Sequence, residues 1–312
     1  GVLNPTVLKR FTLAWNAPEF FQEAHPFYST IGERLQTTII DPIPISRIFN
    51  AVEEQNNWMV ASDKRELERY LGPITRHNDN PNLRAPLGMG AVTGGAIMNP
   101  RLLLKSYSDY LRDASVLREE AFDHHRLQFS ESALHYKDIV CEQIVFAEGA
   151  EVRNNPFFTL DLAAVNKQVF VANKGQYTIF RAPALRLKSV VKGPMMLIPL
   201  GDDCYKIGAT YNRDVYTNNP TKEDSEALET KLKKMIRCEF EVLDQVAGVR
   251  PTVKDRKPLL GAFDTHPNLY FLNGLGTRGL SMAPLLSKWL YEAVEKGKPL
   301  PPAVDINRFS AV

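Results

Sequence analysis

The stretch Leu269-Tyr-Phe-Leu-Asn-Gly-Leu-Gly-Thr-Arg-Gly279 decides how this chain folds. Its apolar start, 269–272, predicts a short buried strand, and the G-x-G-x-x-G pattern after it predicts a glycine turn that leads into a helix over 282–296. Gly297 and Pro299 lie where such a helix ends. Because glycine has no side chain, the turn allows a phosphate or a cofactor to approach the backbone closely. Tight packing between strand and helix is the alternative interpretation.

Strand and helix signals alternate along the rest of the chain. Segments 134–150 and 269–296 each predict a strand, a turn and a helix, as in a parallel α/β layer. The run 161–215 instead predicts an antiparallel sheet, because short turns separate its apolar stretches. We therefore expect an α/β fold with two interleaved domains. Further helices are predicted over 63–71, with Asp63 as N-cap, over 100–118 and over 221–238.

Composition limits the possible classes of protein. The 312 residues, 44% of them hydrophobic, are enough for about two domains. The 38 basic and 36 acidic residues nearly cancel, so the net charge of +2 offers no electrostatic attraction for nucleic acid or an anionic membrane. No run of about 18 apolar residues is present, so no membrane span is expected. Three widely separated cysteines favour a reducing compartment, the cytoplasm.

Several common catalytic patterns are absent. The six histidines include no His-Glu-x-x-His pair and no cluster with suitably spaced acids, so no metal site is predicted. No Gly-x-Ser-x-Gly elbow of a serine hydrolase occurs.

Arg250 is the candidate for binding an anionic group. It lies in Gly248-Val-Arg-Pro-Thr-Val-Lys-Asp255, and Pro251 restricts its backbone to extended conformations. An arginine fixed in this way can present its planar guanidinium to a substrate carboxylate, a pairing that lysine cannot copy. An interdomain salt bridge with one of the chain's acids is the alternative, and the residues alone leave both open.

Three ordered motifs together resemble the FAD-dependent oxidoreductases of the D-amino-acid oxidase and glycine oxidase type. The order and spacing match over most of the chain, from about Asn99 to the end. The last motif also looks like the closing block of the FAD-dependent oxidase domain in the bacterial tRNA wobble-uridine modification enzyme. The motifs are Ile144-Val-Phe-Ala-Glu-Gly149, then Gly248-Val-Arg-Pro-Thr-Val-Lys-Asp255 with Pro258-Leu-Leu-Gly261, then Asn268-Leu-Tyr-Phe-Leu-Asn-Gly-Leu-Gly-Thr-Arg-Gly-Leu-Ser-Met-Ala-Pro284.

The resemblance implies a Rossmann-type FAD-binding domain interleaved with a substrate domain built on an antiparallel sheet. Residues 1–30, 99–160 and 245–312 would form the FAD-binding domain, and residues 31–98 and 161–244 the substrate domain. The family begins with a strand, a G-x-G-x-x-G turn and a helix, a unit of about 30 residues that this sequence lacks. We therefore expect an N-terminally incomplete FAD-binding domain, and weak FAD binding by this chain alone.

The resemblance also assigns site residues. Gly149 would lie near the adenosine half of FAD, and Arg250 would be the catalytic-site residue that binds the substrate carboxylate. Glycine oxidases carry an arginine in the glycine turn where this chain has Thr277, which leaves the substrate open. The residues expected to line the flavin and pyrophosphate are Gly274, Leu275, Gly276, Thr277, Arg278, Gly279 and Leu280.

The implied function is oxidation of a small amine or amino acid by hydride transfer to FAD. The expected partner is this small molecule, with no nucleic acid partner. The alternative function is a cofactor-free FAD fold that serves as a binding or assembly subunit.

Overall fold

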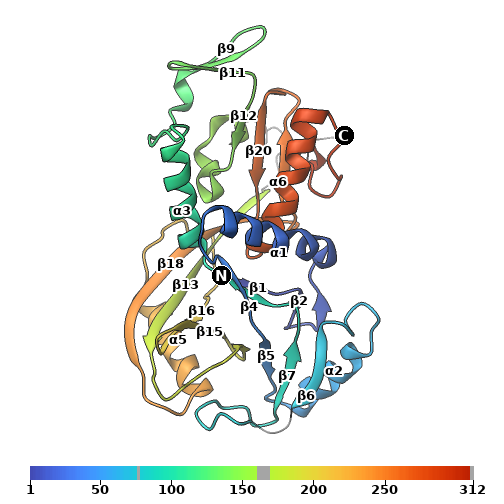
Figure 1. Cartoon of the computed structure of the whole chain (residues 1–312), viewed down its shortest axis with the longest axis vertical. Helices are drawn as coiled ribbons and strands as arrows, with labels where there is room; N and C mark the ends of the chain where they lie inside the picture. The colour runs from blue at the N-terminus through green and yellow to red at the C-terminus, as the bar shows by residue number, and fades with distance from the viewer. Residues whose placement is uncertain (76–77, 160–168, 310–312) are drawn as a thin grey trace. The chain divides into compact units, whose positions relative to one another are not determined.

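The computed structural model describes residues 1–75, 78–159 and 169–309, and the chain divides into two units (Figure 1). Unit 1 consists of Gly1–Leu103, Lys174–Asn212 and Thr217–Gly248. Unit 2 consists of Leu104–Asn173, Arg213–Tyr216 and Val249–Val312. Each unit collects segments that lie far apart in the sequence, so the interleaved α/β organisation is confirmed.

Most of a nine-stranded sheet lies in unit 1. The strand order is β17-β13-β16-β15-β14-β5-β7-β6, with β18 also paired to β13. β13, β16, β15 and β14 pair antiparallel, as predicted for this part of the chain, and β14 pairs parallel with β5. Residues 161–168 of the predicted sheet lie outside the described residues. The strands are β5 (Ile45–Ile48), β6 (Leu71–Thr75), β7 (Met89–Val92), β13 (Phe170–Arg181), β14 (Val190–Lys192), β15 (Met196–Gly201), β16 (Cys204–Gly208), β17 (Asn212–Arg213) and β18 (Glu241–Val253).

Helix α5 (Lys222–Met235) packs on one side of this sheet. Leu228 and Leu232 of the helix are fully buried in one cluster with Phe180 and Ile207 of the strands. Thr221 caps the helix by accepting a hydrogen bond from the Asp224 amide. Burial of this apolar helix face stabilises the packing of α5 on the sheet.

The remaining elements of unit 1 are two small sheets and two helices. One sheet has the order β1-β8-β4, and the other pairs β2 with β3. These elements are β1 (Val2–Leu3), β2 (Thr6–Val7), β3 (Thr12–Leu13), β4 (Ile40–Pro42), β8 (Ala96–Met98), α1 (Ala17–Arg34) and α2 (Val52–Ser62).

Unit 2 contains the strand, glycine turn and helix predicted over 269–296. β20 (Leu269–Asn273) lies between β12 (Ile144–Phe146), its parallel neighbour, and β19 (Leu259–Ala262), its antiparallel neighbour. α6 (Gly279–Lys296) follows β20 and ends at Gly297, whose φ of 62° suits glycine. Buried aromatic residues such as Phe146 and Phe271 fill the core of unit 2. A second sheet consists of β9 (Leu127–Phe129), β10 (Leu134–Tyr136) and β11 (Ile139–Cys141).

One predicted helix is wrong. Residues 63–71 form no helix, and Asp63 is the C-cap of α2 instead of an N-cap. The segment DKRELERYL carries charges on nearly every turn, whereas α2 buries Trp58 and Ala61. Burial of that large aromatic side chain decided the helix position over the polar segment's good helix propensity. The other predicted helices are present as α3 (Pro100–Asp113), shorter than predicted, and α5.

The predicted domain boundaries stay a prediction. Contacts group residues 1–30 with 31–98 in unit 1, but such a grouping does not show which residues bind a cofactor.

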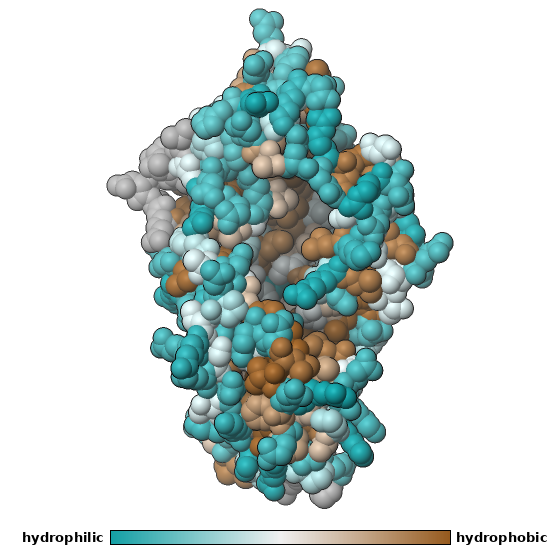
Figure 2. Space-filling view, turned by 90° about the vertical axis from the view of Figure 1, so that its left-hand side faces the viewer, coloured by the Kyte–Doolittle hydropathy of each residue, from teal (hydrophilic) through white to brown (hydrophobic). Residues whose placement is uncertain are grey.

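Figure 2 shows hydrophobic residues interspersed with hydrophilic ones over one face of the molecule. In the described part of the chain, no helix combines the length and the apolar character needed to cross a bilayer.

Candidate cofactor and substrate site

The glycine turn lies between β20 and α6. Glycine suits two of its positions, Gly274 and Gly276, for different structural reasons. Gly274 and Gly276 both have positive φ, 72° and 55°. A Cβ at Gly274 would lie 2.6 Å from Val253 Cγ2, so this glycine permits close packing. A Cβ at Gly276 would meet no atom closer than 3.9 Å, an ordinary van der Waals distance, so packing does not exclude a side chain there. Of these two glycines, Gly276 fits the expectation of a backbone that a ligand can approach, and Gly274 fits the alternative of tight packing.

Asn273 connects the turn to the Gly149 segment. Its side chain is buried, its Nδ2 donates to the Gly149 carbonyl at 3.0 Å, and its Oδ1 accepts from the Gly274 amide at 2.7 Å. One amide side chain thus holds together two segments that are 124 positions apart. The sequence analysis did not assign this role, although a polar residue at the end of a buried strand is a usable signal.

Arg250 is attached to the same group of segments. The Gly276 amide donates to the Pro251 carbonyl at 2.8 Å, which fixes the end of β18 against the glycine turn. Arg250 is half-buried, and its Nη1 donates to Asn173 Oδ1 at 3.0 Å. The structure therefore brings Gly149, the turn and Arg250 together within unit 2.

An unpaired hydroxyl lies beside the turn. Thr252 Oγ1 is buried and has no hydrogen-bond partner within the part of the chain that the structure describes. It is the atom closest to a Cβ built on Gly276, at 3.9 Å. Gly149, with φ of 58°, is more open than Gly276, since nothing described lies within 4 Å of its added Cβ. A buried hydroxyl without a partner is costly, so this place favours a hydrogen-bonding ligand.

The first turn of α6 completes the candidate site. It contains no acidic residue, so the amides at the helix start keep their positive electrostatic character. Burial lowers the pKa of the Arg278 guanidinium, the N-cap residue, although arginine stays charged. Leu275, Gly279 and Leu280 are half-buried, and Thr277 is exposed. All predicted site residues thus lie in unit 2.

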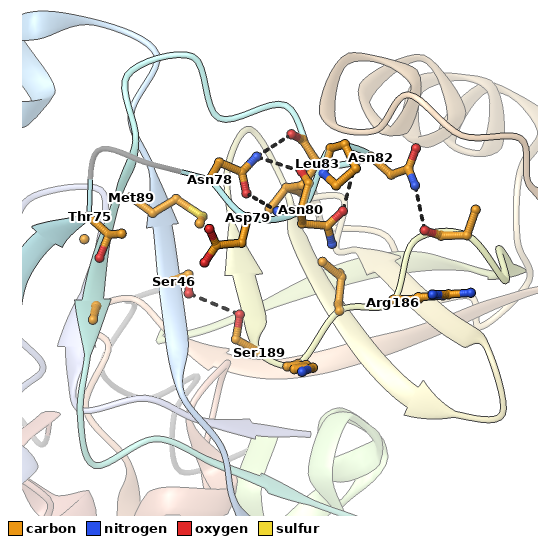
Figure 3. Close-up of a pocket in the computed structure, with 16 residues that line it drawn as sticks. Ser46, Thr75, Asn78, Asp79, Asn80, Asn82, Leu83, Met89, Arg186 and Ser189 are labelled. Atoms are coloured by element: carbon orange, nitrogen blue, oxygen red, sulfur yellow. Dashed lines mark hydrogen bonds between the residues drawn. The ribbon is translucent and has the colours of Figure 1, made fainter.

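Unit 1 contains a separate cavity of about 710 Å³ (Figure 3). Asn78, Asn80 and Asn82 hold one wall through hydrogen bonds to backbone carbonyls, including those of Leu185 and Ala184. None of the predicted site residues lines this cavity. Among the described residues, no three His, Cys, Asp or Glu side chains lie together in a way that could hold a metal ion.

Solved structures of several amino-acid-processing enzymes have a similar fold. Glycine oxidase from Geobacillus kaustophilus superposes with a TM-score of 0.75, at 20% identity, over 95% of this chain and 82% of that chain. Iminodiacetate oxidase from Chelativorans sp. BNC1 has a TM-score of 0.70 at 19% identity, over 94% of this chain and 83% of that chain. At these identities the similarity shows the fold.

The curated relatives are much longer than this chain. The tRNA 5-methylaminomethyl-2-thiouridine biosynthesis bifunctional protein MnmC of Idiomarina loihiensis is 28% identical over 156 residues. The match covers 48% of this chain and 25% of that protein. The protein of the same name from Thiobacillus denitrificans is 40% identical over 62 residues, 20% of this chain and 10% of that protein.

A protein-family model supplies the broadest match. The model, described as FAD dependent oxidoreductase, matches residues 15–293. This range includes Gly149, Arg250 and the whole glycine turn. Because the match covers most of the chain and agrees with the fold, the protein belongs to the FAD dependent oxidoreductase family.

Proposed function

We propose that this protein oxidises an amine or amino acid with FAD as cofactor, and that Arg250 binds the substrate carboxylate. The observation that carries the proposal is the attachment of Arg250 to the glycine turn through the hydrogen bond from Gly276 to Pro251. The fold of glycine oxidase supports the same class of substrate.

The residues present fit the cofactor of this family. Gly149 and Gly276 leave room for a ligand next to the backbone, and Thr252 offers a buried hydroxyl without a partner among the described residues. We propose that these residues, together with 274–280, hold FAD, since the amides at the start of α6 favour negative charge. Bound FAD supplies the acceptor for a hydride from the carbon that carries the substrate nitrogen.

The protein's own contribution is orientation and charge. Asn173 orients the guanidinium of Arg250 by accepting a hydrogen bond at 3.0 Å, and Pro251 keeps the backbone of Arg250 extended. A carboxylate bound to this guanidinium would place the substrate in a single orientation. The substrate amine can enter in its neutral form, so no side-chain base is required.

The test compares Arg250 variants of the FAD-loaded protein. We expect Arg250→Ala to lower kcat/KM at least about a hundredfold for an amino acid, since a lost charge-assisted pair of about 3 kcal/mol has this effect. Arg250→Lys should restore little, because lysine lacks the planar fork. The rate is that of flavin reduction, which is measured in single-turnover mixing from the change in the visible absorbance of the flavin.

Lys254→Ala is the matched control, because Lys254 is an exposed cation close to Arg250 in the chain. If Arg250→Ala melts at a lower temperature but keeps the rate of the control, Arg250 stabilises the fold and does not bind substrate. A protein that binds no FAD and oxidises no amine or amino acid would support the alternative, a cofactor-free fold that serves as a binding or assembly subunit.

A second candidate substrate is an amine carried on tRNA. The two curated relatives described above, which match 48% and 20% of this chain, are named for the biosynthesis of tRNA 5-methylaminomethyl-2-thiouridine. The net charge of +2 supports the small-molecule substrate, because tRNA binding draws on many cationic contacts. Flavin reduction by modified tRNA and by its free amine at equal concentration distinguishes the two, and a rate with tRNA alone would overturn the small-molecule proposal.

A further inference from the structure

The cavity of about 710 Å³ in unit 1 lies on the side of the nine-stranded sheet against which α5 packs. Ser46 of β5 lines the cavity and is two positions from Ile48, which is buried in the cluster with α5. The two side chains therefore share one side of the sheet, while Ile45 packs with Trp58 on the other side. All described residues that line the cavity belong to unit 1, so it is separate from the site proposed at the glycine turn.

Asparagine side chains fix one wall of this cavity. Asn80 Nδ2 donates to the Leu185 carbonyl at 2.6 Å. Asn82 Nδ2 donates to the Ala184 carbonyl at 2.7 Å, so two loops that are about a hundred positions apart are held together. Asn78 Oδ1 and Asn80 Oδ1 each accept from a backbone amide two positions further on. Because these contacts form within the protein, a ligand would bind to a wall that is already ordered.

Three oxygen-bearing side chains meet inside the cavity. The hydroxyls of Ser46, in β5, and Ser189, just before β14, lie 3.1 Å apart. The Asp79 carboxylate, from the loop after β6, points toward this pair (Figure 3). When one serine donates to the other, the second O–H is left to donate, and both serines and the carboxylate can still accept. This combination favours ligand hydroxyls, which donate and accept, over an ammonium ion, which cannot accept.

The rest of the lining is apolar on the sheet and cationic on one loop. Met89 and Ala91 of β7 line the cavity and fit the C–H face of a sugar ring. Asp79, Arg186 and Lys188 are the charged residues among the described ones that line it, and both cations are exposed. Arg186 extends away from Asp79 (Figure 3). The lining thus fits a ligand with hydroxyls at one end and an anionic group at the other.

We propose that this cavity binds a phosphate monoester that carries neighbouring hydroxyl groups, such as a sugar phosphate or a nucleoside monophosphate. The hydroxyls would hydrogen-bond to Asp79, Ser46 and Ser189. The phosphate would pair with Arg186 and Lys188. The carboxylate disfavours a bare anion, and the two cations disfavour a neutral sugar. The volume is sufficient for either source of this chemistry.

Binding is measured by calorimetric titration of the full chain without added cofactor, so the outcome does not depend on amine oxidation. The probes are glucose 6-phosphate and AMP, with glucose, adenosine and inorganic phosphate for comparison, at constant ionic strength. We expect one of the two esters to bind at least about tenfold more tightly than its neutral counterpart and than phosphate. The tighter ester identifies a sugar phosphate or a nucleotide as the ligand class. Equally weak binding of all five compounds would overturn the proposal.

Asp79→Asn separates recognition of hydroxyls from simple attraction of an anion. We expect this change to weaken binding of the preferred ester about tenfold, because the ligand hydroxyls lose a charged acceptor. A site that only attracts phosphate would bind the ester more tightly after the change, since a repelling charge is removed. Tighter binding would therefore overturn the proposal. Should Asp79→Asn not fold, Ser46→Ala tests the same hydroxyl contacts, again with weaker binding expected.

Lys188→Gln tests the phosphate end of the ligand. It should weaken binding of the ester at least about fivefold and leave that of the matching neutral compound unchanged. Asp41→Asn and Lys64→Gln are the matched controls, because both residues are exposed in unit 1 and neither lines the cavity. AMP bound at the glycine turn of unit 2 would be insensitive to Asp79→Asn and Lys188→Gln. Equal binding to the natural chain and to both variants would thus place the ester elsewhere and overturn the proposal.

Discussion

At the scale of single residues, Asn273 has the most consequential contacts of the candidate site. It is 1% exposed and satisfies both the Gly149 carbonyl and the Gly274 amide. We expect Asn273→Leu to lower the free energy of unfolding by about 2–4 kcal/mol, because the buried Gly274 amide and the partly buried Gly149 carbonyl both lose their partner. Urea unfolding measures the loss. Asn268→Leu changes an exposed asparagine just before the same strand, and an equal loss in that variant would contradict the role of the Asn273 contacts.

Substitutions at two glycines, Gly90 and Gly248, measure the importance of close packing at single residues. A Cβ at Gly90 would lie 2.4 Å from the Trp58 ring, whereas a Cβ at Gly248 would meet nothing within 4 Å. We expect Gly90→Ala to lower the free energy of unfolding by about 1–3 kcal/mol, the usual cost of overpacking. Gly248→Ala should leave it nearly unchanged. The midpoint of urea unfolding is the measurement, and similar midpoints for both variants would show that Trp58 can move without cost.

At the scale of elements, Gln176 joins β13 to the start of α5. Its buried side chain accepts from the Thr221 amide at 2.8 Å and donates to Ser225 Oγ at 2.7 Å. Gln176→Leu leaves the Thr221 amide without this partner and removes one of the hydrogen bonds of Ser225 Oγ, which still donates to the Thr221 carbonyl, so we expect a loss of about 1–3 kcal/mol in the free energy of unfolding. Hydrogen exchange should become faster in the first turn of α5 in particular. Unchanged exchange there, as in the exposed-site control Gln128→Leu, would show that the Leu228 and Leu232 side chains alone hold the helix.

At the scale of the whole molecule, β13 and β18 belong to both units. Loss of structure in one unit should therefore disturb strands of the other, and we expect the two units to unfold together. Phe271, fully buried in unit 2, provides the perturbation, because Phe271→Ala should cost about 3–5 kcal/mol. Trp58, buried in unit 1, provides the signal once Trp15 and Trp289 are replaced by phenylalanine. We expect the Trp58 transition to move to lower urea.

An unchanged Trp58 transition, with loss of unit 2 structure at lower urea, would contradict this expectation. Leu104→Ala, an exposed position in unit 2, is the control that should move neither transition.

The strand, glycine turn and helix at 269–297 could be predicted from the sequence because their signals are local. These signals are the apolar strand residues, the G-x-G-x-x-G spacing of the turn, and Gly297 at the helix end. The antiparallel strands after Phe170 were predictable for the same reason, since short turns join them. The helix predicted over 63–71 was wrong because its position depends on the burial of Trp58 between distant strands, which no local pattern contains.

By itself, the sequence determined the α/β class, the order of the local elements and the residue types of the candidate site. Those properties follow from periodicity, turn residues and backbone restrictions, which act over a few neighbouring positions. Only the tertiary structure decided that Gly149 meets Asn273, that Pro251 holds Gly276, and that Ser46 meets Ser189 in the cavity of unit 1. Such contacts join residues far apart in the chain, and they form because burial of the shared core brings their strands into register.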